Sequence, residues 1–255
     1  MSGRLRAKER CRRLLHSAMS ALLRLRAGRY RFPGPETILV VAPHPDDETL
    51  GCGGLISRRR LQGDSVHVLY VTDGEAAFPD SKTLAPASVA SMRRAEACSA
   101  MRILGVDLAE MTFLSVPDGT LKDLDARAAA ALESRIAEVL TRVAPDELIL
   151  PCRRDGSSEH EAVFTRAMGA LARSGLRPRV LHYPVWAHWS PRGLVRLLGA
   201  KRVWRVGDEG FWDVKRRAIG TYVSQVRGVP PDDAPVLSKE FLAFFSGEEE
   251  FFFEE

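Results

Sequence analysis

The stretch TILVVAPHPDDETLGCGG, residues 37–54, decides the fold. Its first six residues, 37–42, are apolar and rich in β-branched side chains, which is typical of a strand buried on both faces of a parallel sheet. An acidic turn follows at 43–48, and residues 49–60 have a helical pattern that Gly63 ends. The stretch therefore predicts a strand, a turn with polar side chains, and a helix.

The same alternation continues along the chain. Strands that alternate with helices form right-handed βαβ units and a mostly parallel sheet. We therefore predict an α/β fold, a Rossmann-like three-layer sandwich, with a helical region toward the C-terminus. The expected strands are 66–72, 111–114, 147–151 and 179–186, and the expected helices are 88–104, 126–143 and 159–174.

The turn after the first strand carries the chemistry. Ligands of open parallel sheets gather beyond the carboxyl ends of strands, where His44, Asp46 and Asp47 lie. One aspartate of such a turn can bind a metal beside His44 while the other faces a substrate water. His160 begins the helix that follows the strand at 147–151, at the same sheet edge. His44, Asp47 and His160 then form a metal site with one position open for water, which suits zinc and also accepts iron or cobalt.

The sequence around these residues resembles a known family. PHPDDETLGCGG at 43–54 is similar to the signature of the PIG-L/LmbE-like zinc-dependent N-deacetylases, which act on N-acetylglucosamine-type amides. The resemblance spans about residues 36–245. It includes TDGE at 72–75, RRAE at 93–96, LGV at 104–106, PDG at 117–119 and the segment from Lys215 to Gln225.

The resemblance implies a role for each matching residue. His44, Asp47 and His160 match the zinc ligands of the family, which implies one Zn²⁺ per chain. Asp46 matches its general base. The residues that match positions holding the sugar or its substituent are Arg93 and Asp118.

One departure from the family pattern concerns the second motif. It usually reads HPDH, whereas residues 157–160 read SSEH, so Ser157 replaces a histidine that helps to stabilise the oxyanion or to protonate the leaving amine. Because the loss of one oxyanion donor costs about 10²–10³ in rate, another group would have to substitute. Our hypothesis is that His182 or His188 reaches the site. The alternative is that His182 packs within its strand and that His188 lies on the surface.

These observations predict a metal-dependent hydrolase, a zinc-dependent N-deacetylase that acts on an N-acetylglucosamine-type conjugate such as a glycolipid, a glycan precursor or a secondary metabolite. The alternative, which Ser157 favours, is a carbohydrate-binding or scaffolding protein of the same fold with a vestigial site. A metallo-phosphoesterase is another alternative, because aspartates at strand ends can bind two metal ions. It would need a further pair of metal ligands, which the sequence does not offer. Nucleotide binding is disfavoured because the two carboxylates would repel a pyrophosphate at this turn.

The charge of the chain is concentrated at its ends. Residues 1–31 contain ten lysines and arginines against one acid, while residues 32–247 contain equal numbers of bases and acids and residues 248–255 add five acids. The net charge of +4 therefore comes from the two ends of the chain, and the body is neutral. A neutral body argues against nucleic acid as a partner. The three phenylalanines at 251–253 are expected to dock on the domain.

We divide the chain into a basic amphipathic arm, residues 1–35, and a deacetylase-like domain, residues 36–255. The pattern of the arm favours a helix packed on the domain, with peripheral contact of residues 1–31 with an anionic membrane and a transit peptide as the alternatives. Four dispersed cysteines indicate reduced thiols. We expect a cytoplasmic protein, with the inner membrane surface as the alternative location, and an N-acetylated sugar conjugate as its partner.

Overall fold

The computed structural model describes residues 17–18, 20–207, 210–231, 233–245 and 247–254. In this part of the chain eight strands form one sheet, in the order β1-β7-β8-β6-β5-β2-β3-β4. The pairings are parallel except those that β8 makes with β6 and β7. The strands are β1 (Gly28–Arg29), β2 (Thr37–Ala42), β3 (Ser65–Thr72), β4 (Met111–Val116), β5 (Glu147–Pro151), β6 (Arg179–Tyr183), β7 (Arg202–Val206) and β8 (Glu250–Glu254).

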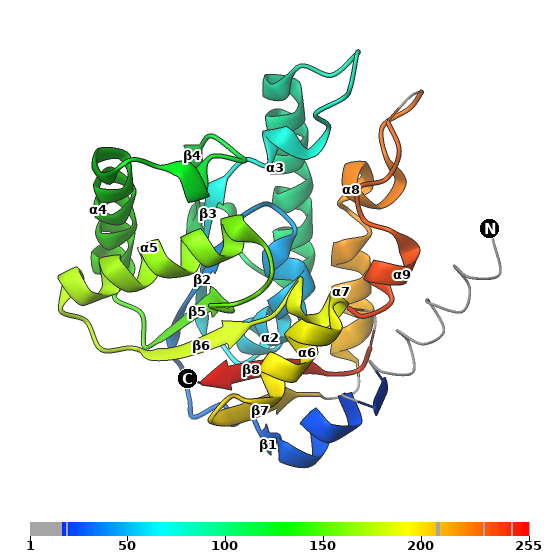
Figure 1. Ribbon diagram of the computed structural model, residues 1–255. Coiled ribbons are helices and arrows are strands. Elements are labelled where there is room, and N and C mark those ends of the chain that lie inside the picture. Colours follow the sequence, from blue (N-terminus) through cyan, green and yellow to red (C-terminus); the bar gives the residue numbers. More distant parts are fainter. Residues whose placement is uncertain (1–16, 19, 208–209, 232, 246, 255) are drawn as a thin grey trace.

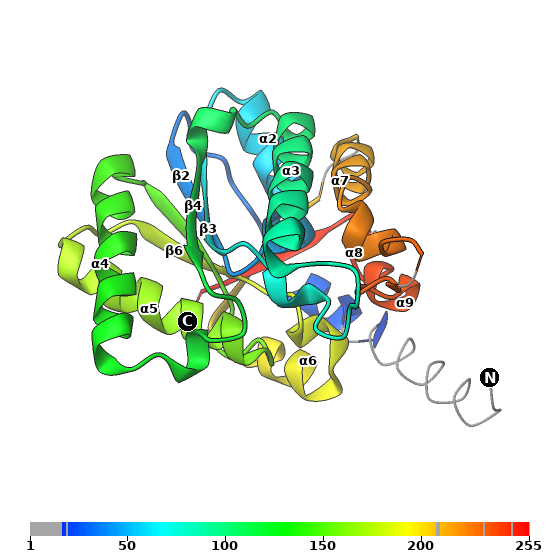
Figure 2. The same ribbon diagram turned by 90° about the horizontal axis from the view of Figure 1, so that it is seen from above.

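Helices cover both faces of the sheet (Figures 1 and 2). The helices α2 (Asp47–Leu61), α3 (Pro86–Leu104) and α7 (Phe211–Ile219) pack together on one face, and α4 (Ala126–Val143) and α5 (Ser158–Ser174) cover the other. The predicted three-layer α/β architecture is confirmed. The shorter helices are α6 (Pro191–Leu198), α8 (Val223–Arg227), α9 (Lys239–Leu242) and the 3₁₀ turns η1 (Glu75–Ala77), η2 (Leu108–Glu110), η3 (Leu121–Asp123) and η4 (Ala187–Trp189).

Strand β2 explains why its sequence is continuously apolar. Ile38 and Val40 belong to the core beneath α2 and α3, whereas Leu39 and Val41 belong to the core beneath α4 and α5. Because successive side chains of a strand point to opposite faces, a strand covered on both sides needs apolar residues at every position. The strand ends at Ala42, and the acidic turn begins where the two cores end.

The C-terminal region contains helices, as predicted, in α7, α8 and α9, but it also contains two strands, β7 and β8. The phenylalanines at 251–253, which were expected to dock on the domain, form part of β8, between β6 and β7. Phe252 is fully buried. The strand predicted at 179–186 ends at Tyr183, because Pro184 has no N–H for the sheet.

Residues 28–30 of the N-terminal segment contact the body of the structure. Residues 28–29 form β1, which pairs with β7, and Tyr30 is 3% exposed and donates a hydrogen bond to Glu147. The predicted contacts of residues 1–16 and 19 lie outside the described residues. None of the described helices has the length and the apolar character that crossing a membrane requires.

Candidate active site

Three side chains meet beyond the carboxyl ends of β2 and β5. His44 follows β2, Asp47 begins α2, and His160 lies in the first turn of α5. His44 Nδ1 lies 3.1 Å and His160 Nε2 lies 3.3 Å from the same oxygen, Asp47 Oδ2. One potential ligand atom from each residue lies within 4.8 Å of the others. The structure therefore brings together the three residues that the sequence predicted as metal ligands.

Each imidazole contacts a second carboxylate through the ring nitrogen that does not face Asp47. His44 Nε2 is 3.0 Å from Asp118 Oδ1, and His160 Nδ1 is 2.8 Å from Asp155 Oδ2. These contacts leave the other nitrogen of each ring directed at Asp47. Carboxylates in this position fix the tautomer of a metal-binding histidine and raise its basicity. Asp118 was predicted to bind the sugar, and the structure places it against His44; contact with a sugar stays a prediction.

The electrostatics of the cluster fit a metal ion. Burial alone lowers the pKa of both imidazoles, but Asp118 and Asp47 raise the pKa of His44 to about 9, and Asp47 and Asp155 raise that of His160 to about 10. Burial would raise the pKa of Asp47, yet the two imidazoles hold it well below its usual range. The carboxylates thus favour positive charge at this point. His160 is fully buried, and its Nε2 faces the Asp47 carboxylate, the side from which a metal ion would be bound.

Asp46 is held beside the cluster in a strained conformation. Its φ of 129° is one that residues other than glycine rarely adopt. Glu48 accepts the backbone N–H of Asp46 at 3.0 Å, and Arg93 Nη2 donates to Asp46 Oδ2 at 2.9 Å. Burial raises the pKa of Asp46 to about 7, against the lowering effect of Arg93. A carboxyl with this pKa can take and return a proton near neutral pH.

Arg93, predicted to bind the sugar, is used mainly to hold the turn. It is 4% exposed, and besides Asp46 it donates to the carbonyl oxygens of Pro45 and Gly74. Gly74 has a φ of 69°, and a Cβ there would lie 2.0 Å from Arg93 Nη1, so this position requires glycine. Arg93 also lines the cavity of the site, and its contact with a sugar stays a prediction.

A cavity of about 180 Å³ opens over these groups. Polar side chains line its floor, and apolar ones from the β6–η4 connection and the C-terminal segments form a wall. Asp155, Gln225 and this wall were not among the predicted site residues; an acid five residues before His160 was the only local signal for Asp155. The lining residues are His44, Asp46, Asp47, Leu50, Ala76, Ala77, Arg93, Asp118, Ser157, Val185, Trp186, Gln225, Val236, Leu237 and Phe241.

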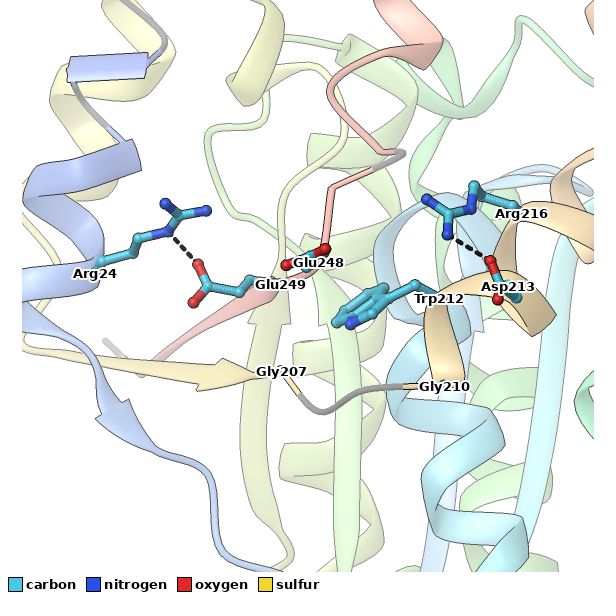
Figure 3. A pocket seen from close by; sticks show the side chains of 8 residues that line it. All are labelled: Arg24, Gly207, Gly210, Trp212, Asp213, Arg216, Glu248 and Glu249. Atoms are coloured by element: carbon cyan, nitrogen blue, oxygen red, sulfur yellow. Dashed lines mark hydrogen bonds and ion pairs between the residues drawn. The ribbon is translucent and has the colours of Figure 1, made fainter.

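The larger cavity of Figure 3, about 670 Å³, is a different place. It shares no lining residue with the candidate site, and its arginines are paired with acids: Arg24 with Glu249 and Arg216 with Asp213. It brings together none of the predicted site residues.

Neither candidate replacement for the missing histidine lies in the site cavity. His182 packs against Phe164 and lines a second cavity, and His188 packs against Phe245 and lines a third. The hypothesis that one of them reaches the site is wrong. In β6 the side chain of His182 points to the face covered by α5, because its neighbour Tyr183 takes the other face. Ser157 does line the site cavity.

Comparison with curated proteins gives two relatives with related names. The chain is 32% identical over 168 residues to 1D-myo-inositol 2-acetamido-2-deoxy-alpha-D-glucopyranoside deacetylase of Kineococcus radiotolerans, covering 55% of this chain and 46% of the relative. It is 30% identical over 172 residues to 2'-N-acetylparomamine deacetylase of Streptomyces fradiae, covering 63% and 57%. The chain thus spans about half the length of the curated relatives it matches.

Solved structures confirm the fold. N,N'-diacetylchitobiose deacetylase from Pyrococcus horikoshii matches with a TM-score of 0.59 and 20% identity, covering 88% of this chain and 80% of that one. The hydratase GalB from Pseudomonas putida matches with a TM-score of 0.58 and 23% identity, covering 74% and 79%. The fold therefore carries more than one chemistry, and function depends on the site.

A family model described as "PIG-L: GlcNAc-PI de-N-acetylase" matches residues 39–171. This range is just over half of the chain and includes all of the predicted site residues, from His44 to His160. The chain therefore belongs to the PIG-L family.

Proposed function

We propose that this protein is a metal-dependent N-deacetylase that hydrolyses the acetamide of an N-acetylglucosamine-type sugar conjugate. One observation carries the proposal: a buried carboxyl, Asp46, lies beside the cluster of His44, Asp47 and His160 on the floor of a cavity. The names of the two curated relatives support an acetylated amino sugar as the substrate class.

We propose zinc as the metal, held by His44, Asp47 and His160. Two imidazoles and one carboxylate are a common donor set of catalytic zinc sites. When bound, such an ion polarises the amide carbonyl and lowers the pKa of a water to about 7. Metal analysis of protein purified without added metal tests this assignment: about one equivalent of zinc is expected, and iron or cobalt in its place would contradict it.

In this mechanism the residues of the chain move and hold the proton. Asp46 accepts the proton of the attacking water and returns it to the departing amine. Arg93 keeps the Asp46 carboxylate oriented and favours its ionised form, because the guanidinium lies 2.9 Å away. Asp118 and Asp155 hold the two imidazoles. Ser157 lines the cavity and can donate a hydrogen bond to the developing oxyanion.

Acetate release from a panel of N-acetylglucosamine conjugates by the metal-loaded protein tests the proposal. Asp46→Asn should lower the rate by about 10²–10⁴ while the metal content stays near that of the wild type. Asp123→Asn, at a carboxylate that is 72% exposed, is the matched control and should keep full activity. Loss of metal together with activity in Asp46→Asn would assign Asp46 as a ligand instead.

A binding or scaffolding protein with an inactive site is the second candidate, and Ser157 favours it. A histidine can act as an imidazolium at this position, whereas a serine hydroxyl cannot. Metal binding without acetate release from any conjugate would favour this second function. Acetate release that Asp46→Asn removes would exclude it.

We propose in addition that the basic arm touches an anionic membrane surface. The described part of this segment supports it: Leu25 is 84% exposed and Leu22 is 46% exposed, and Arg26 follows Leu25 in the sequence. Leu23 is fully buried, so residues 20–30 must be kept for folding. Deletion of residues 1–16 should weaken binding to anionic vesicles and leave acetate release from a soluble substrate unchanged. Equal vesicle binding by both proteins would refute the proposal.

A further inference from the structure

We propose that the protein has a second ligand site, which binds the phosphate group of a phosphomonoester. The site is a cavity of about 410 Å³ between the loop after β5, strand β6, helix α6 and strand β8. It shares no lining residue with the candidate active site, so the proposal does not depend on the deacetylase function. The lining residues that matter are Arg154, Arg196, Lys201, His182 and, at its apolar side, Leu197 and Phe253.

The cavity concentrates positive charge. Four cationic residues line it, and no carboxylate is among the residues that line it in the described part of the chain. The side chains of three of the cations, Arg154, Arg196 and Lys201, make no hydrogen bond or ion pair with any described residue. In the larger cavity of Figure 3, by contrast, both arginines are paired with acids. Unpaired cations that converge on a cavity are expected where an anion completes the site.

His182 is an independent indication of a ligand. It is 5% exposed, and neither ring nitrogen has a hydrogen-bond partner among the described residues; Nδ1 has no accessible surface, so Nε2 is the nitrogen that a ligand in the cavity can reach. Buried polar groups normally have a partner, since burial without one costs free energy. Burial also lowers the pKa of His182 to about 4, so the ring is neutral at pH 7 and can exchange a hydrogen bond with a ligand.

The chemistry of these groups favours phosphate over other anions. A phosphomonoester carries a charge of about −1.5 to −2 near neutral pH and three acceptor oxygens. Two guanidinium groups and one ammonium group supply the matching charge, and the planar guanidinium binds phosphate oxygens in pairs. Leu197 and Phe253, both buried, provide an apolar surface for the part of the molecule that bears the phosphate.

Isothermal titration calorimetry of the full chain with sn-glycerol 3-phosphate and with inorganic phosphate tests the site. We expect saturable binding that the variant R154Q/R196Q/K201Q weakens by at least about tenfold. The matched control is R102Q/R127Q/R217Q, which removes the same charge from exposed arginines of α3, α4 and α7 and should bind like the wild type. Thermal unfolding of both variants without ligand verifies that each is folded.

Two results would overturn the proposal. Binding that is equal in R154Q/R196Q/K201Q and the wild type would place the phosphate elsewhere, for example at the metal of the active site. Absence of binding to both soluble probes and to phosphatidylcholine vesicles that contain phosphatidic acid would show that no phosphate site exists. Binding to the vesicles alone, lost in R154Q/R196Q/K201Q and kept in R102Q/R127Q/R217Q, would support the site and identify a lipid headgroup as the source of the phosphate.

Discussion

Asp155 links His160, one of the three candidate metal ligands, to the rest of the fold. One of its oxygens lies 2.8 Å from His160 Nδ1, and its carboxylate also accepts the backbone N–H groups of Val185, Trp186 and Ala187. The residue is fully buried. It therefore fixes both the orientation of His160 and the loop that carries the Trp186 wall of the cavity.

Asp155→Asn should weaken metal binding by about 10–100-fold, because an amide no longer raises the basicity of His160 as a carboxylate does. Competition with a chromophoric chelator measures the affinity. Asp123→Asn provides the control, since that carboxylate is 72% exposed and its ion pair is with Lys122. Unchanged metal affinity in a folded Asp155→Asn protein would contradict the role given to Asp155.

His182 should make the free energy of unfolding depend on pH. Its pKa in the folded protein, about 4, lies below the ordinary value of 6.5, so the unfolded chain binds the proton more readily. The stabilisation is complete above about pH 6.5 and is lost as the pH falls toward 4, by about 3 kcal/mol. Urea unfolding between pH 4 and 7 should show a smaller loss for His182→Asn than for the wild type. If the free energy of unfolding falls by the same amount between pH 7 and 4 in both proteins, the prediction is wrong.

At the scale of elements, α2 is the helix whose first turn presents the acidic residues of the site. Its middle is held by an ion pair from the C-terminal part of the chain. Lys215 Nζ donates to the carbonyl oxygen of Leu50, and the Glu250 carboxylate accepts the N–H groups of Gly54 and Leu55. Lys215 and Glu250 are 2.7 Å apart and buried. The position of the site thus depends on residues outside the range that the family model matches.

Lys215→Met should destabilise the protein by about 3–5 kcal/mol, because it leaves the Glu250 carboxylate buried and unpaired. Denaturant unfolding measures the change. Arg217→Met is the control on the same helix, at an exposed position, and should change the stability by about 0.5 kcal/mol or less. The double variant K215M/E250Q should recover part of the loss; no recovery would mean that the charge of Glu250 is not the cause.

At the scale of the whole molecule, the C-terminal strand β8 connects the two parts of the sheet. Strand β8 lies between β6 and β7 and joins the parallel part of the sheet to the β7–β1 edge (Figure 1). Phe252 and Phe253 are 0% and 2% exposed, and Phe251 is 6% exposed. Each buried phenylalanine contributes about 1.5–3 kcal/mol, against a total stability of about 5–15 kcal/mol for a domain.

Deletion of residues 248–255 should therefore abolish cooperative thermal unfolding, whereas a docked surface tail would be dispensable. Circular dichroism during heating gives the result. Phe252→Ala should be intermediate, with a loss of about 3–5 kcal/mol. A truncated protein that unfolds cooperatively near the wild-type temperature would show that β8 does not hold the sheet together.

The sequence predicted the parts of the protein that depend on neighbouring residues. The apolar run of β2 and the alternation of helices and strands up to β6 are local patterns, and the structure confirms them. The motif at 43–48 and His160 also predicted which candidate metal ligands come together, because both follow strands whose ends meet at one sheet edge. β1, β7 and β8 were missed, since their pairing depends on partners far along the chain.

By itself, then, the sequence determined the α/β fold, the position of the site and the three candidate metal ligands, because local chemistry and strand order are sufficient for these. Only the tertiary structure decided which side chains contact the site residues and which point elsewhere. Asp155 reaches His160, Arg93 reaches Asp46, and His182 turns away to a separate basic cavity. The direction of a side chain from a loop or a strand depends on packing against distant residues, and no local pattern contains that information.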